Sequence, residues 1–385
     1  MNSSGVAHML RGRDVCICAG SGGVGKTTIS AAIAAGMASR GKKVAVLTID
    51  PAKRLADSLG LPELGNAERR VDPALFEAEG IEIDDGELWA MMLDAKATFD
   101  EVIAKHAPDA ETRDRILENR IYRQISNALA GSQEYMAMEK LFELHQEDRY
   151  DLLVLDTPPT RNALDFLDAP RRMTQFIEGR SLQVFMRPTG LGMRLFGRGT
   201  SMMFSALRRL TGVDLLEDIS EFFQAFSGMV GGFQERAKRV SELLADKRTS
   251  FLVVCGPQGE PIEEAVYFHR KLVEAALPFG GVIVNRVHYS SEFETAPDQD
   301  VVGELEDALG DPDLAARAAA SLADYRGLAE SDAGNIERLT AEMRARRVIK
   351  VPYLDDDVHD LGGLMEVNRY LFATGSEREA LAAAR

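Results

Sequence analysis

A glycine-rich stretch near the N-terminus holds the residues best suited to chemistry. Residues 20–28 read Gly-Ser-Gly-Gly-Val-Gly-Lys-Thr-Thr, which fits the phosphate-loop pattern G-x-x-x-x-G-K-[ST] at every fixed position. The glycines let the backbone curl so that successive N–H groups face one anion, while Lys26 adds a positive charge and Thr27 a hydroxyl for Mg²⁺. We predict that nucleotide phosphates are bound by Gly20, Ser21, Gly22, Gly23, Val24, Gly25, Lys26, Thr27 and Thr28.

The segments on either side of this loop have the sequence patterns of a strand and of a helix. Residues 14–19 form a short apolar run of strand length, and residues 29–38 are rich in alanine and contain no proline. The loop therefore joins a strand to a helix. A glycine-rich turn with a chance Lys-Thr is the alternative, and this setting argues against it.

Two aspartates stand where further apolar runs end. Asp50 follows residues 43–49, and Asp156 follows residues 152–155. Parallel sheets bind ligands at the carboxyl ends of their strands, and a carboxylate there, downstream of a phosphate loop, is typical of a group that acts on Mg²⁺. We assign this role to Asp156, with a plain strand-end turn as the alternative. Asp50 is followed by Pro51 and could cap a helix, which is compatible with a role at the nucleotide.

Seven apolar runs predict an α/β fold: a doubly wound, mainly parallel sheet of the P-loop NTPase type with an inserted helical subdomain. The runs are residues 14–19, 43–49, 88–93, 152–155, 251–255, 281–287 and 348–352. We expect further helices at 261–277 and 364–372. Asn285 lies near the end of one run, where an amide can read a nucleotide base. A surface or capping asparagine would give the same pattern.

The length of 385 residues exceeds the size at which one core usually stops growing. We assign residues 1–93, 151–164 and 246–385 to an ATPase core, which includes an acidic helical hairpin at 291–346. Residues 94–150 and 165–245 are expected to be helical insertions. Within the second insertion, residues 185–204 interleave methionines with glycines, a composition typical of apolar surfaces that can repack around a partner. An ordinary core helix or a nucleotide lid is the alternative.

Composition argues against several classes of function. The chain has 45 basic and 61 acidic residues, a net charge of -16, which repels nucleic acid and anionic lipid. No stretch reaches the roughly eighteen apolar residues of a membrane span, and no signal-peptide core is present, so we expect a cytoplasmic protein. The three cysteines, Cys16, Cys18 and Cys255, are predicted to be inert core thiols, with no disulfide and no structural metal.

The assembled motifs resemble those of the arsenical-pump-driving and tail-anchored-protein-targeting ATPases, within the deviant Walker A group, and the sequence looks closest to bacterial anion-transporting ATPases. The resemblance spans most of the chain. It implies Mg-ATP as cofactor, a dimer as the working form, and a nucleotide contact at Pro352. It rests on residues 20–28, on Thr-Ile-Asp-Pro-Ala at 48–52, on Asp-Thr-Pro-Pro-Thr at 156–160, on Val284-Asn285 and on Val351-Pro352.

Three departures from this family matter. The family's loop carries a lysine directly after its first glycine, which reaches across the dimer to the partner's nucleotide, and here that residue is Ser21. The arsenite-binding thiols of the pump ATPase have no counterpart. The Cys-x-x-Cys that holds zinc at the targeting ATPase's dimer interface is also missing. If a homodimer forms, another cation such as Lys53, Arg54 or Arg161 must replace the lysine charge.

The resemblance implies an ATP-hydrolysing dimeric switch that couples its Mg-ATP state to a hydrophobic client. In this reading Lys26 holds phosphates, Thr27 and, through water, Asp156 hold Mg²⁺, and Asp50 orients the attacking water. Two alternatives stay open. The chain could be a soluble subunit that energises an anion or metalloid transporter, with a membrane protein as a transient partner. It could also be a weakly hydrolysing regulatory subunit of a heterodimer with a related ATPase. The residues alone do not show whether the base of the bound nucleotide is adenine or guanine.

Overall fold

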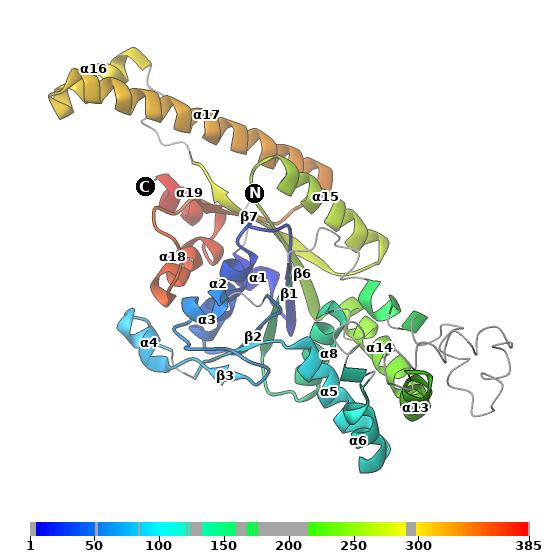
Figure 1. The fold of residues 1–385 in the computed structure, drawn as a ribbon. Coiled ribbons are helices and arrows are strands. Elements are labelled where there is room, and N and C mark those ends of the chain that lie inside the picture. The colour runs from blue at the N-terminus through cyan, green and yellow to red at the C-terminus, as the bar shows by residue number, and fades with distance from the viewer. Residues whose placement is uncertain are drawn as a thin grey trace. The chain divides into compact units, whose positions relative to one another are not determined.

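Eight strands form one sheet in the order β3-β4-β2-β5-β1-β6-β7-β8 (Figure 1). Neighbouring strands run parallel, apart from the pair β3 and β4. The central strands are buried along their whole length, as their continuous apolar sequences predict. The strands are β1 (Val15–Ala19), β2 (Lys43–Thr48), β3 (Arg69–Arg70), β4 (Glu87–Met92), β5 (Leu152–Asp156), β6 (Thr249–Cys255), β7 (Phe279–Val287) and β8 (Val348–Pro352).

The structure is a computed structural model that describes residues 5–50, 53–83, 85–120, 122–123, 133–158, 168–172, 174–175, 215–289 and 298–383. The chain divides into two units. The first comprises Met1–Met92, Glu147–Ala163 and Ala245–Arg385, and the second comprises Leu93–Gln146 and Leu164–Leu244. The methionine-rich stretch predicted at 185–204 lies outside the described residues, as do Pro51, Ala52 and residues 159–161.

Helices cover both faces of the sheet in the first unit. Alanines and isoleucines of α2 and leucines of α18 pack with Cys16, Cys18 and their neighbours in one core on one face. On the other face α15 contacts β6 and β7 (Figure 1). The predicted fold class is therefore confirmed. The helices are α1 (Val6–Met9), α2 (Lys26–Ala38), α3 (Arg54–Ser58), α4 (Pro73–Ala78), α15 (Gly259–Glu274), α16 (Asp298–Leu309), α17 (Pro312–Met343), α18 (Leu361–Leu371) and α19 (Gly375–Ala383).

The second unit is helical and is built around stacked aromatic rings. Phe99, Tyr122, Phe222, Phe226 and Phe233 contact one another in series, with ring centroids 5.2 to 6.0 Å apart along the chain of stacked and tilted pairs. Such pairs add to the stability that burial alone supplies. Its described helices are α5 (Ala95–His106), α6 (Ala110–Glu118), α8 (Gln133–Gln146), α13 (Leu215–Ser227) and α14 (Val230–Ala245).

Several elements differ from the sequence prediction. The two-residue strand β3 was not expected, because Arg69 and Arg70 are exposed and charged. Helix α18 begins at Leu361 rather than at residue 364, since Asp360 caps it by accepting a hydrogen bond from the Gly363 N–H at 2.8 Å. Among the described helices, none is long and apolar enough to cross a membrane.

Candidate nucleotide-binding site

The loop between β1 and α2 has the shape of an anion cradle. Gly23 and Gly25 adopt left-handed backbone angles, with φ of 77° and 89°, which side-chain-bearing residues rarely adopt. A Cβ atom on Gly25 would also lie only 2.4 Å from Asn285 Nδ2. Because Gly25 occupies the N-cap position of α2, the unpaired N–H groups of the first helical turn point into the loop. Glycine is thus required at position 25 by both conformation and space.

Lys26 is folded back across this loop. Its Nζ atom donates a hydrogen bond to the Ser21 carbonyl oxygen at 2.7 Å, and only 6% of the residue is exposed. Burial lowers the pKa of Lys26, and the carboxylates of Asp156 and Asp50 oppose that shift. The ammonium group is therefore fixed at the mouth of the loop, where a phosphate oxygen would replace the carbonyl as its acceptor.

Asp156 collects two hydroxyl groups at the carboxyl end of β5. Thr27 Oγ1 donates to Asp156 Oδ2 at 2.7 Å, and Thr48 Oγ1 donates to the same oxygen at 2.9 Å. The sheet register makes this possible, because Asp156 is paired with Cys18 of β1 and with Thr48 of β2. The first turn of α2 and the ends of two strands therefore meet at one carboxylate.

The other oxygen of this carboxylate is suited to a magnesium site. Asp156 Oδ1 is buried and has no hydrogen-bond partner, and burial raises the pKa of Asp156 to about 6. Mg²⁺ favours oxygen ligands and is usually held by one or two protein groups together with water and substrate phosphates. The Thr27 hydroxyl and the Asp156 carboxylate fit that pattern. No cluster of three or more His, Cys, Asp or Glu that could hold a metal occurs among the residues described.

Asp50 lies beside this centre. Its N–H donates to Thr48 Oγ1 at 3.2 Å, which places it directly after the strand that also supplies Thr48. Helix α3 begins at Arg54, with Lys53 in the N-cap position. The capping interpretation of Asp50 stays a prediction, because residues 51 and 52 lie outside the described part of the chain.

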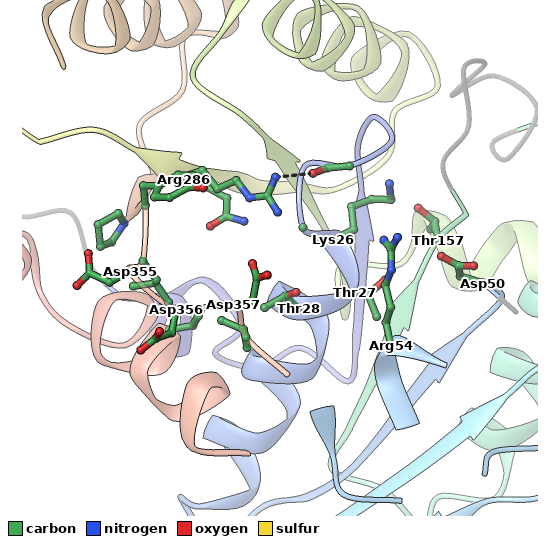
Figure 2. Close-up of a pocket in the computed structure, with 18 residues that line it drawn as sticks. Lys26, Thr27, Thr28, Asp50, Arg54, Thr157, Arg286, Asp355, Asp356 and Asp357 are labelled. Carbon is green, nitrogen blue, oxygen red and sulfur yellow. Dashed lines mark hydrogen bonds between the residues drawn. The ribbon is translucent and has the colours of Figure 1, made fainter. Parts of the chain in front are cut away.

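A cavity of about 950 Å³ joins these groups. Figure 2 shows Asp50, Arg54 and Thr157 on one side of Lys26, with Arg286 and Asp355 to Asp357 on the other. Asn285 Nδ2 donates to the Val24 carbonyl oxygen at 2.9 Å, so this amide supports the phosphate loop. The lining residues are Gly23, Gly25, Lys26, Thr27, Thr28, Asp50, Arg54, Thr157, Asn285, Arg286, Pro352, Tyr353, Leu354, Asp355, Asp356, Asp357, Val358 and Val367.

Residues 13–299 match the family model described as "Anion-transporting ATPase". The chain belongs to this family. The expected resemblance is confirmed by individual relatives at modest identity. A protein of Aquifex aeolicus named provisionally as arsenical pump-driving ATPase 1 is 28% identical over 284 residues, covering 71% of this chain and 63% of the relative. ATPase GET3A of Arabidopsis thaliana is 25% identical over 274 residues, covering 71% and 67%. The chain thus spans slightly less than two thirds of the first relative.

One part of the cavity wall was not predicted from the sequence. Arg286 follows Asn285 on β7, adopts a left-handed φ of 61°, and donates to the Gly23 carbonyl oxygen at 3.3 Å. Tyr353 and the three aspartates after it come from the loop that follows β8. Their position at the end of a predicted strand, or directly after one, was the available signal, since ligands bind at that edge of a parallel sheet.

The buried carboxylate makes ligand-free stability depend on pH. The pKa of Asp156, about 6, lies above the ordinary value near 4, so the folded chain retains a proton that the unfolded chain releases between these values. The stability that this bound proton contributes to the folded chain is therefore lost as pH rises from about 4 to about 6. We expect Asp156→Asn to stabilise the ligand-free protein by about 2–3 kcal/mol at pH 7.

Urea unfolding between pH 4 and pH 8 measures this effect. The difference between variant and wild type should shrink toward pH 4, and stabilisation by Mg-ADP should be lost in the variant. Asp57→Asn, which alters an exposed aspartate of α3, is the control. A variant that is no more stable than wild type at pH 7 would contradict the assignment of this buried charge.

Proposed function

We propose that this chain binds Mg-ATP in the cavity and hydrolyses it, and that it works as a dimeric switch whose nucleotide state controls binding of a hydrophobic client. The observation that supports this most is the meeting of Thr27, Thr48 and Asp156 beside the loop that holds Lys26. This arrangement would let a phosphate cradle and a carboxylate suited to Mg²⁺ act together at one sheet edge. A cytoplasmic location is part of the proposal.

Each residue has a separate part in the proposed reaction. Lys26 and the N–H groups of the loop bind phosphate oxygens, and Thr27 and, through water, Asp156 hold Mg²⁺. When bound, this ion neutralises charge on the phosphates. Asp50 orients and polarises the attacking water from the end of β2. Figure 2 shows Asp50 on the same side of Lys26 as Arg54 and Thr157. Asn285 and Pro352 line the cavity and are proposed to contact the rest of the nucleotide.

Two substitutions separate binding from chemistry. Lys26→Ala should weaken Mg-ATP binding and turnover together, because the ammonium contacts phosphates in ground and transition states. Asp50→Asn should bind Mg-ATP almost normally yet lose about 10²-fold in kcat, the scale of a positioned base. Calorimetric Kd values and steady-state kcat values test both, with Asp57→Asn as the control. Near-normal turnover by Asp50→Asn would exclude its role toward water.

Arg54 is the best placed described residue to supply the charge that Ser21 cannot. It lines the cavity, and in Figure 2 its side chain points toward the ends of Lys26 and Asp50. Lys53, its neighbour in sequence, is exposed and is not among the lining residues. Arg161, the other candidate, lies outside the described residues. We therefore propose that Arg54 acts on the transferring phosphate from within the same chain, as an arginine finger does.

Removal of Arg54 should affect the rate rather than the affinity. We expect Arg54→Ala to lower kcat by about 10³-fold with little change in the Kd for Mg-ADP, because the charge acts mainly on the transition state. Lys53→Ala is the matched control and should have near-normal activity. Unchanged kcat in Arg54→Ala, together with strong acceleration by a related subunit that carries the family lysine, would favour the heterodimer alternative.

The family description and the pump-related names of some relatives favour a second function, in which the chain energises an anion or metalloid transporter. The cysteines argue against a thiol site for a metalloid. Cys16, Cys18 and Cys255 are all fully buried in the sheet, and burial raises the pKa of Cys255 to about 12, which disfavours the reactive thiolate.

Stimulation of ATP hydrolysis discriminates between these two functions. We expect antimonite or arsenite to leave kcat within about twofold of its basal value, since no described thiol is accessible. A hydrophobic client peptide should instead bind in a nucleotide-dependent way, which can be measured by fluorescence with ATP analogue and with ADP. Strong stimulation by the metalloid, without peptide binding in either state, would support the transporter function.

A further inference from the structure

A second hollow lies between the C-terminal end of α2 and the helices α18 and α19. It measures about 580 Å³, within the usual range of ligand sites, and it shares no lining residue with the nucleotide cavity. Helix α18 contacts both α2 and α19 (Figure 1). All three helices belong to the first unit of the chain. We call this hollow the α18–α19 groove.

The floor of the groove is apolar. Phe372 and Leu381 contribute large side chains that are only partly buried against the core, and Ala373 and Ala380 contribute small ones. A ligand that covered these side chains would remove apolar surface from water, which favours binding. The floor therefore suits a ligand with an apolar body.

Two arginines stand beside this floor. The Arg40 guanidinium lies 3.8 Å from the centroid of the Phe372 ring, and its Nη1 atom donates to the Gly36 carbonyl oxygen at 2.6 Å. Arg369 is exposed in the last turn of α18. Within the described part of the chain, neither arginine forms an ion pair with a carboxylate. In a chain of net charge -16, these two cations are therefore suited to an anionic group from outside.

The carboxylate of Glu377 also lines the groove, but it is bonded to Thr374. It accepts hydrogen bonds from the Thr374 N–H at 2.7 Å and from Thr374 Oγ1 at 2.9 Å. These hydrogen bonds lower the pKa of Glu377 and hold its charge at the start of α19. Helix C-termini favour cations in general, which explains either arginine taken alone. It does not explain an apolar floor between two arginines, an arrangement suited to an amphipathic anion.

Both α2 and α18 connect the nucleotide cavity to the groove. Thr27 and Thr28, in the first turn of α2, line the cavity, whereas Arg40, two residues after the end of α2, lines the groove. On α18 the consecutive residues Val367 and Asn368 line the cavity and the groove, respectively. A ligand in the groove and a nucleotide in the cavity would therefore contact the same two helices.

The two helices meet at Gly36, where α2 has no side chain. A Cβ atom there would overlap the Phe372 ring and would lie 2.7 Å from Asn368 Oδ1. Asn368 is 3% exposed, and this oxygen has no hydrogen-bond partner among the described residues. Because an unpaired buried oxygen costs stability, a small shift of α18 that gives it a partner would be favourable. A ligand of either site could therefore move this contact.

We propose that the α18–α19 groove binds a free amphipathic anion, an aliphatic carboxylate whose charged end contacts Arg40 and Arg369 and whose chain covers the apolar floor. A free ligand is preferred to a membrane lipid because the net charge of -16 repels an anionic bilayer. Occupancy of the groove raises the affinity of the nucleotide cavity, because the ligand restrains α18 against α2. This link, but not the groove itself, rests on the nucleotide binding proposed above.

Octanoate, 1-octanol and acetate separate the two parts of such a ligand. By calorimetry, wild type should bind one octanoate per chain about tenfold more tightly than octanol, because the arginines add charge-assisted hydrogen bonds. Acetate, which lacks the chain, should show no binding at the same concentrations.

Three variants locate the binding. Arg369→Gln should weaken octanoate binding about fivefold and leave octanol binding unchanged. Ala380→Glu places a carboxylate on the floor at an exposed position of α19 and should abolish octanoate binding. Arg346→Gln, which alters an exposed arginine outside both cavities, is the matched control. Thermal melting checks that each variant is folded.

Mg-ADP measures the link between the two sites. Saturating octanoate should lower the Kd for Mg-ADP about threefold in wild type, and saturating Mg-ADP should lower the Kd for octanoate by the same factor, as reciprocity requires. Ala380→Glu should bind Mg-ADP as wild type does, and octanoate should leave that affinity unchanged.

The opposite results would overturn the proposal in distinguishable ways. Absence of octanoate binding, or binding that Ala380→Glu leaves intact, would exclude the site, and equal affinity for octanoate and octanol would exclude the role of the arginines. Sedimentation with phosphatidylglycerol vesicles that is lost in Arg369→Gln, without octanoate binding, would show that the groove binds a membrane. Octanoate binding with no change in Mg-ADP affinity would exclude the link alone. Wild type that binds octanoate but not Mg-ADP would support the groove and contradict the proposed nucleotide function.

Discussion

The buried carboxylate of Asp156 is the group on which the candidate site depends. A carboxylate taken out of water is costly unless other groups replace its hydration, and here the replacement comes from two hydroxyls, those of Thr27 and Thr48. These hydroxyls belong to the helix that follows the phosphate loop and to the strand that precedes Asp50. One set of hydrogen bonds therefore fixes the distance between the cradle and the segment that would act on water.

Burial of the central strands explains why so much of the fold could be predicted. Strands that are buried on both faces of a parallel sheet read as continuous apolar runs, and the central strands here are of that kind. The phosphate loop was predictable because its chemistry restricts residue types, as Gly25 shows with its left-handed φ and its contact to Asn285. Local sequence was sufficient for prediction wherever only one residue type fits the backbone angles and the space at a position.

The rest could not be read from local sequence because it depends on which segments become neighbours. Local sequence suggested a base contact for Asn285, and it did not indicate that the amide nitrogen also donates to the Val24 carbonyl, a partner more than two hundred residues away in the chain. The short strand β3 has two exposed arginines and no apolar pattern at all. In these cases contacts between segments far apart in the sequence, such as the pairing of β3 with β4, decided the outcome rather than local propensity.

The hydrogen bond between Lys26 and the Ser21 carbonyl has a consequence for the thermodynamics of binding. A long flexible side chain normally loses rotational freedom when it takes hold of a ligand, and that loss opposes binding. Here the ammonium group is already restrained at 2.7 Å from a backbone oxygen, so that entropy has been given up during folding. An arriving phosphate would exchange a neutral acceptor for a charged one, which forms the stronger hydrogen bond. Discrimination among anions at this loop would then follow their charge and geometry, with little contribution from ordering of the protein.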